Sequence, residues 1–246
     1  AGSPGARGPT RTACSTADCT GGTGAVGGAL ANIDSATSGV GFANGNIIHV
    51  KNGTYNELVT NAATDIKMYG YDITRDDNPT GTNRPLIDAQ STRANCLTST
   101  GSGGMYIRNF RFSGGTSHNV QTNTSTGDAG ITLINCKSSS SAADGIESAG
   151  TGGTRITLID SELNNNTSNG MAIGEAFGCY IHDNTAEGVL GSGDIILSIS
   201  EANSNHGISF ASSNTKKIQN VTLDGNTGAI SYGIINSNST TSSVLG

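Results

Sequence analysis

Short runs of alternating apolar and polar residues recur along the chain from residue 105 onward. Four of them are ITLINCKSSSSAADGIES from residue 131, ITLIDSELNNNTSNGMAI from 156, CYIHDNTAEGVL from 179 and ILSISEANSNHGISF from 196. Alternation of this kind is typical of a β-strand with one buried face. Each run continues through Asn or Asp and a polar stretch to a Gly that precedes another apolar residue. The pattern predicts a series of similar units, each built from strands and sharp turns.

The glycine of this pattern recurs at a spacing that suits one coil of a solenoid. It falls at Gly145, Gly170, Gly188, Gly207 and Gly233, in steps of 25, 18, 19 and 26 residues. No helical pattern separates the strands, so a doubly wound sheet is poorly supported and an all-β parallel β-helix is predicted. In such a solenoid each strand pairs with its equivalent about 4.8 Å away, and equivalent residues form columns along the axis.

Residue types at the ends of the runs agree with this architecture. Asn135, Asp160 and Asp183 each follow an apolar run, and we expect them at equivalent corners, where their side chains bond exposed backbone groups. Cys136 and Cys179 lie in apolar stretches and are predicted to be small core residues. The interior is therefore expected to be narrow and filled by stacked aliphatic side chains.

The start of the chain differs from the repeats, as the end of a solenoid must. Three Gly-X-Y triplets follow Ala1 and predict either a flexible leader or the stub of a collagen-like stalk, which implies a homotrimer. Val26, Leu30 and Ile33 have the spacing of a weak amphipathic helix, which we expect to cap the first coil. The predicted organisation is a leader over 1–13, a cap over 14–46, a parallel β-helix over 47–238 and a Ser/Thr-rich tail over 239–246.

Composition excludes several function classes. The chain has 36 Gly among 246 residues, no Trp and 34% hydrophobic residues, which disfavours a wide helix-bundle core. The net charge is -6 and the 13 Lys and Arg are scattered, which argues against a nucleic-acid partner. No apolar run is long enough for membrane insertion. Of the five cysteines, Cys14 and Cys19 lie close enough in CSTADC to form a disulfide under oxidising conditions.

The order of these features carries a family resemblance. A predicted lid is followed by NIIHVKNGTYNELV, by IKMYGYD and then by coils ending in DGI, NGM, EGV and HGI. This order, over roughly residues 14–236, resembles the pectin-lyase-like superfamily. The resemblance implies a single-stranded, right-handed parallel β-helix with a short N-terminal capping helix. That superfamily includes polysaccharide lyases, glycoside hydrolases, epimerases, phage tailspikes and non-catalytic surface proteins, so it does not define an activity.

One predicted column carries the candidate catalytic residues. Asp144, Asn169, Glu187 and His206 each precede a repeat glycine, and a solenoid stacks them. Asp144, Glu187 and His206 could supply the acid and base that cleavage of a glycosidic bond needs, whereas the structural interpretation makes them solvent-facing corner residues. The polygalacturonase pattern is only partly present, as His206 and Gly207, without its paired aspartates or its Arg-x-Lys. The Asp-Pro-His-Glu of alginate epimerases is absent.

Residues 72–85 form the one substantial polar loop and are the expected place for binding. The candidate binding residues are Asp76, Asp77, Arg84, the neighbouring Tyr71, and Asn169. Asp76 with Asp77, or Asp160 with Glu162, could bind Ca²⁺, but no calcium-binding motif is present. The four histidines are dispersed without ligand spacing. We therefore predict no cofactor and no metal site, with Ca²⁺ as the exception to test.

A complete fold signature beside an incomplete catalytic one favours a non-catalytic role. The leading hypothesis is an extracellular or virion-surface β-helix, such as a phage decoration, spike or adhesin component, that presents a rigid surface to a glycan or another surface protein. The alternative is a polysaccharide lyase or glycoside hydrolase acting on an acidic polysaccharide. A third hypothesis uses ladders of hydroxyl and amide groups, such as 138–141 against 164–166, to contact glycans, ice or proteins.

Overall fold

The computed structural model describes most of the region from residue 45 to residue 227 and short pieces on either side. The described residues are 10–13, 29–30, 33, 45, 47–62, 64–72, 79–100, 104–122, 130–149, 156–191, 194–210, 217–227, 234–236 and 243–245. Within them the helical content is a single 3-10 turn, η2 (Gly81–Asn83). No helix in this part of the chain is long and apolar enough to cross a membrane.

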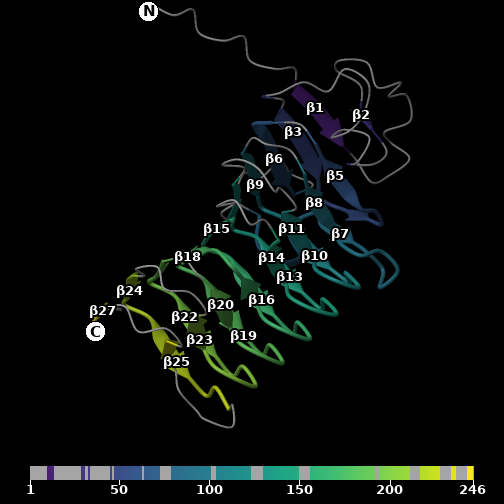
Figure 1. The fold of residues 1–246 in the computed structure, drawn as a ribbon. Coiled ribbons are helices and arrows are strands. Elements are labelled where there is room, and N and C mark those ends of the chain that lie inside the picture. Colours follow the sequence, from purple (N-terminus) through teal and green to yellow (C-terminus); the bar gives the residue numbers. More distant parts are fainter. Residues whose placement is uncertain are drawn as a thin grey trace, which may run out of the picture.

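The strands form three parallel sheets, and the chain visits the sheets in the same order in every coil (Figure 1). Sheet A contains β1 (Thr10–Ala13), β2 (Ala29–Leu30), β3 (Ile47–Lys51), β6 (Ile66–Tyr71), β9 (Met105–Arg108), β12 (Ile131–Ile134), β15 (Ile156–Ile159), β18 (Glu175–Phe177), β21 (Ile195–Ile196), β24 (Lys217–Gln219) and β27 (Ser243–Leu245). Sheet B contains β4 (Thr54–Tyr55), β7 (Leu86–Asp88), β10 (Arg111–Ser113), β13 (Lys137–Ser139), β16 (Glu162–Asn164), β19 (Tyr180–His182), β22 (Ile199–Glu201) and β25 (Thr222–Asp224). Sheet C contains β5 (Val59–Asn61), β8 (Leu97–Ser99), β11 (Val120–Thr122), β14 (Ile146–Ser148), β17 (Met171–Ala172), β20 (Val189–Gly191), β23 (Ile208–Phe210) and β26 (Ile234–Asn236). This arrangement is a parallel β-helix, as the sequence predicts.

The core is a stack of aliphatic columns. In sheet A, Ile131 pairs with Ile156 and Leu133 with Leu158, and all four side chains are buried. The strands alternate buried and half-buried residues, so every second side chain enters the solenoid. Since each apolar side chain packs on a similar one in the next coil, short strands of three or four residues suffice to build a continuous core.

Corners between sheets A and B are closed by residues with a left-handed backbone. Asn109, Asn135 and Asp160 have φ values of 65°, 50° and 48°, a conformation that Asn and Asp tolerate better than most residues. Asn135 and Asp160 are therefore corner equivalents, as predicted. Asp183 is not their equivalent, because it follows β19 of sheet B and occupies the next corner with Asn165. The runs from 131 and 156 begin in sheet A, whereas the run from 179 begins in sheet B.

The glycine column of the sequence repeat is confirmed by strand register. Ile146 pairs with Met171, Met171 with Val189, and Val189 with Ile208, which aligns the glycine before each of them. The column needs glycine because coils approach closely there. A Cβ atom on Gly170 would lie 2.7 Å from the carbonyl oxygen of Gly188.

The ends of the chain differ from the predicted organisation. β1 lies inside the segment predicted as a leader and pairs with β3, and β27 lies inside the predicted tail and pairs with β24. The predicted capping helix falls mostly outside the described residues, and within it Ala29–Leu30 is a strand that pairs with β1. Adjacent Gly27 and Gly28 disfavour a helix there. Residues 14 and 19, the predicted disulfide pair, lie outside the described residues.

Polar groups also form columns, and several of these are buried. Ser138, Ser141, Asn164 and Asn166 are each 7% exposed or less. The predicted outward ladder of hydroxyl and amide groups at these positions is therefore wrong, because the alternation turns these side chains into the solenoid, where neighbouring coils supply their hydrogen bonds.

Candidate functional site

The column that carries the predicted catalytic residues exists and extends one coil further than expected. Strand register aligns His118 with Asp144, Asn169, Glu187 and His206, and we call this set the mixed column. Its members stitch successive coils together. Asp144 Oδ1 accepts hydrogen bonds from the backbone N–H of Asn169 at 2.9 Å and from its Nδ2 at 2.8 Å. Asn169 Oδ1 accepts one from the backbone N–H of Glu187 at 3.1 Å.

The three predicted catalytic side chains do not form one acid–base group. Asp144 is separated from Glu187 by the Asn169 coil, and His206 contacts Glu187 through Nδ1 at 3.4 Å. Glu187 Oε1 also accepts a hydrogen bond from Asn205 Nδ2 at 2.7 Å. Most of the donors and acceptors of this column are thus committed to holding coils together, which is the structural interpretation of the column.

A cleft of about 260 Å³ lies on the outer face of sheet B. Arg84, Arg111, Lys137 and Glu162 line it, together with Gly81, Thr82, Leu86, Ser113 and Ser139. Its charged side chains carry a formal excess of two positive charges, although the whole protein has a net charge of -6. The sequence shows no basic stripe because these cations come from separate coils. Only strand register places them together.

The two guanidinium groups of the cleft are held by carbonyl oxygens. Arg84 Nη1 donates to the backbone oxygen of Asn135 at 2.7 Å, and Arg111 Nε donates to that of Arg84 at 3.1 Å. Burial lowers the pKa of both groups, and for Arg111 the nearby charge of Arg84 adds to the effect. Among the described residues, neither guanidinium has a recorded salt bridge. The cleft therefore presents positive charge that the protein compensates only partly.

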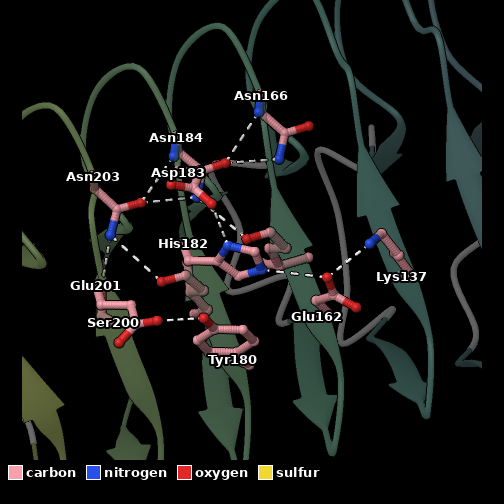
Figure 2. Close-up of polar contacts among 12 residues, drawn as sticks. Lys137, Glu162, Asn166, Tyr180, His182, Asp183, Asn184, Ser200, Glu201 and Asn203 are labelled. Carbon is pink, nitrogen blue, oxygen red and sulfur yellow. Dashed lines mark hydrogen bonds and ion pairs between the residues drawn. The ribbon is translucent and has the colours of Figure 1, made fainter.

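A row of polar side chains continues from the cleft along sheet B (Figure 2). Lys137, Glu162 and Tyr180 occupy equivalent positions in three successive strands. Lys137 Nζ lies 2.7 Å from Glu162 Oε1, and His182 Nε2 lies 3.3 Å from the same oxygen. Burial raises the pKa of Glu162, but the hydrogen bonds and charges of Lys137 and His182 outweigh this effect and lower it overall.

Tyr180 and His182 form an aromatic platform at the far end of this row. Their rings are stacked, with centroids 4.0 Å apart, and Tyr180 is 38% exposed. The Tyr180 hydroxyl donates to Glu201, which with the nearby carboxylates raises the pKa of Tyr180 to about 12. The ring face is thus available for contact while the hydroxyl stays protonated at neutral pH.

The other tyrosines lie on sheet A. His49 stacks near Tyr69 and Tyr71 with centroids 5.9 Å and 5.2 Å away, and Tyr69 lies 5.8 Å from Tyr106. All four are half-buried on the outer face of the strands, because Ile66 and Met68 take the inward positions. A hollow of about 140 Å³ lined by Tyr69, Gly70, Tyr71, Arg108 and Asn109 lies beside them.

The predicted binding residues are dispersed. Arg84 lines the sheet B cleft, Tyr71 belongs to the sheet A aromatic group, and Asn169 stitches the mixed column. Residues 76 and 77 lie outside the described residues. Of the predicted Ca²⁺ pairs, Asp160 and Glu162 are not joined, since Glu162 pairs with Lys137 and His182. The sequence analysis missed Arg111, Lys137 and Glu162, which share a strand position that correct phasing of the coils would reveal.

Comparison with known proteins supports no closer assignment than the fold. No known protein family matches the sequence, and no curated protein matches it. Among solved structures, the chain is similar to a pectin methylesterase from carrot at 11% identity and a TM-score of 0.46, with 99% of this chain and 91% of that chain covered. It is also similar to ORF18 of Geobacillus virus E2 at 9% identity and a TM-score of 0.35, with 74% and 52% covered. The strand register itself defines the chain as a parallel β-helix protein.

Proposed function

We propose that this protein binds an acidic polysaccharide along the outer face of sheet B. The observation that carries the proposal is the cleft in which Arg84, Arg111 and Lys137 meet a single carboxylate, on a protein that is acidic overall. A guanidinium group matches the planar, two-oxygen geometry of a carboxylate or sulfate, and partial burial strengthens the attraction. A repulsive protein surface around one cationic cleft also favours binding at that cleft alone.

The row beyond the cleft suits a chain-like ligand. Arg111, Lys137, Glu162 and Tyr180 follow one another in successive strands, which at about 4.8 Å per strand extends the row over about 14 Å. The exposed Tyr180 ring offers an apolar face against which a sugar ring packs. A polymer with acidic groups can therefore place one group in the cleft and a neighbouring ring on the platform.

The chemistry of the row favours binding over turnover. A lyase needs a base that is unprotonated at working pH, but the Tyr180 pKa is raised to about 12 and Lys137 is held as a cation by Glu162. A hydrolase needs a protonated acid, but the pKa of Glu162 is lowered. We accordingly propose a non-catalytic β-helix that displays this face on an extracellular or virion surface.

The proposal is tested by measuring the affinity of the full chain for polygalacturonate and alginate, with dextran as the neutral reference. We expect binding of an acidic polymer that weakens as salt is added, and no binding of dextran. Arg111→Gln should lower the affinity about 10-fold or more, since a hydrogen bond to a charged group contributes about 1.5–3 kcal/mol. Lys67→Gln is the matched control, because it removes one positive charge from an exposed position on sheet A.

Two outcomes would overturn the proposal. Equal affinity for dextran, or equal losses in Arg111→Gln and Lys67→Gln, would show that the cleft does not recognise acidic groups. The same samples are followed for new reducing ends and for the ultraviolet absorbance of unsaturated uronate. Turnover that Glu162→Gln abolishes would establish the polysaccharide lyase or glycoside hydrolase alternative instead.

A further inference from the structure

A second polar cluster lies at the other end of the sheet B to sheet C connections, away from the cleft. It joins His118, Asp144 and Glu147, and one donor atom from each lies within 4.8 Å of those of the other two. His118 Nε2 is 2.9 Å from Glu147 Oε2, and His118 Nδ1 is 3.7 Å from Asp144 Oδ2. The cluster therefore holds an imidazole between two carboxylates.

Strand register explains why these residues meet. Val120 of β11 pairs with Ile146 of β14, so His118 lies one coil below Asp144, and Gln121 lies one coil below Glu147. The three residues thus come from two successive coils, although 29 residues separate the first from the last in the sequence. Single-residue spacing along the chain gives no sign of such a set.

The cluster is enclosed, and one of its nitrogen atoms is unsatisfied. His118 is 8% exposed and Asp144 is 9% exposed. His118 Nδ1 is shielded from solvent and has no hydrogen-bond partner among the described residues. A buried polar atom without a partner is costly and rare in folded proteins, which points to a group that completes the site.

The carboxylates are oriented by neighbours that leave room for such a group. Asn169 binds Asp144 through Oδ1 alone, so Oδ2 faces the imidazole. Gln121 Nε2 donates to Glu147 Oε2 at 2.7 Å, and Gln121 Oε1 accepts from Asn95 Nδ2 at 3.0 Å. Hydrogen bonds of this kind fix the carboxylates of metal sites in position.

The charge of the cluster is also incomplete. Among the described residues, His118 is the only basic group recorded within ion-pair distance of Asp144 or Glu147. The other histidine–carboxylate clusters differ. Lys137 compensates Glu162 next to His182, and Glu187 is the single carboxylate recorded against His206. Two carboxylates and one imidazole in an enclosed site are balanced by a divalent cation.

We propose that His118, Asp144 and Glu147 bind a divalent transition-metal ion such as Zn²⁺. An imidazole nitrogen and two carboxylate oxygens are ligands that Zn²⁺ accepts, whereas Ca²⁺ takes oxygen ligands and disfavours the nitrogen. Because the ligands come from neighbouring coils, the ion cross-links them. This site is independent of the proposed polysaccharide cleft, and neither proposal depends on the other.

The test uses the full chain after treatment with EDTA and removal of the chelator. Titration with Zn²⁺, followed by calorimetry, should give one site, and Co²⁺ should give the visible absorption of a low-coordinate protein complex. Zn²⁺ in large excess over its dissociation constant should raise the midpoint of thermal unfolding by about 5 °C, because it binds only the folded chain.

Three variants remove one ligand each while keeping its shape: His118→Gln, Asp144→Asn and Glu147→Gln. Each should weaken Zn²⁺ binding by about 100-fold, more than the effect typical of an outer-shell change. His206→Gln is the matched control, because His206 pairs with one carboxylate in the same column, and its Zn²⁺ affinity should equal that of the wild type.

Asp144→Asn keeps an oxygen for Asn169 to bind, so it preserves the fold, and circular dichroism checks this for all variants. The proposal is overturned if the wild type binds no Zn²⁺, or if Asp144→Asn and Glu147→Gln bind it as the wild type does. It is also overturned if Ca²⁺ binds with higher affinity than Zn²⁺, because an all-oxygen site elsewhere would then explain the result. Polysaccharide affinity, measured on the same variants, should not change.

Discussion

Two polar columns run along the connections from sheet B to sheet C, and they use the same device for different ends. The mixed column contains His118, Asp144, Asn169, Glu187 and His206, and the amide column contains Asn166, Asn184, Asn203 and Asn226. In both, a side-chain oxygen of one coil accepts the backbone N–H of the next (Figure 2). The amide column is uniform and closed, since each Asn donates to its neighbour and accepts from the other side.

The difference lies in what remains after the coils are joined. An amide has both a donor and an acceptor, so a column of amides satisfies itself. A carboxylate has no donor, so Asp144 and Glu187 leave oxygen atoms that face other groups. Uniform columns therefore stabilise the solenoid, and titratable residues in a column create places where a ligand can bind.

The largest expected effect comes from breaking the amide column in its middle. Asn184→Ala removes the oxygen that accepts from the backbone N–H of Asn166 at 3.2 Å and from its Nδ2 at 2.9 Å. It also removes two donors to Asn203 Oδ1. Since each buried group left without a partner costs about 1–3 kcal/mol, the free energy of unfolding should fall by about 3 kcal/mol or more. Urea denaturation measures this loss.

Asn205→Ala is the control for that experiment, because Asn205 bonds the Glu187 side chain near the surface of the same connections. Its cost should stay below about 1 kcal/mol. Equal costs for the two variants would mean that burial of the amide column contributes nothing beyond an ordinary surface hydrogen bond.

The glycine column lies beside the mixed column and should give the next largest effect. Gly170→Ala places a Cβ atom 2.7 Å from both the Gly188 carbonyl oxygen and Ile181 Cγ2. Overpacking of this kind costs about 1–3 kcal/mol, and here it also pushes two coils apart. Gly104→Ala, where the new Cβ would meet the Gly130 oxygen at an ordinary 3.6 Å, should change the unfolding free energy little. Thermal unfolding of both variants compares the two positions.

The sequence predicts the fold because each coil repeats the same local chemistry. Alternating apolar runs, the glycine column and corner residues such as Asn135 and Asp160 all follow from single-residue preferences. The start of the chain is predicted less well, since Ala29–Leu30 pairs with β1 instead of continuing a helix. A partner strand at the sheet edge determines that conformation, and sequence spacing does not report it.

The candidate sites are much harder to predict than the fold. Strands of all three sheets are short and alternate alike, so the run containing Asp183 is easily placed in the wrong sheet. An error of phase hides the alignment of Arg111 with Lys137 and of His118 with Asp144, because both depend on coils of unequal length. The prediction of the mixed column succeeds where glycine marks its register.

The outer face of sheet B supplies a smaller and pH-dependent effect. The pKa of Glu162 is lower in the folded protein than its ordinary value of 4.5, despite burial, because of Lys137 and His182. This group therefore stabilises the fold above that value, and the contribution is lost as pH falls through the lower folded pKa. Glu162→Gln should cost less than about 1 kcal/mol at pH 7, since the pair is partly exposed. Denaturant unfolding of wild type and variant should converge in acid; a gap that persists there would exclude the ion pair as its cause.

Replacing the carboxylate of the mixed column by an amide should have the smallest effect of all. Asp144→Asn keeps the oxygen that Asn169 binds, and Asn169 itself performs the same task for the next coil. It also removes one of two negative charges that face His118, so with metal absent the free energy of unfolding should change by less than about 0.5 kcal/mol. Asp144→Ala should cost about 1–3 kcal/mol, because the Asn169 N–H and Nδ2 then lose their acceptor. If both variants lose the same stability in EDTA, the carboxylate charge itself supports the fold, and the two columns are held together by different forces. If only Asp144→Ala loses stability, one hydrogen-bonding device builds both columns, and the charge at Asp144 is free to serve a ligand.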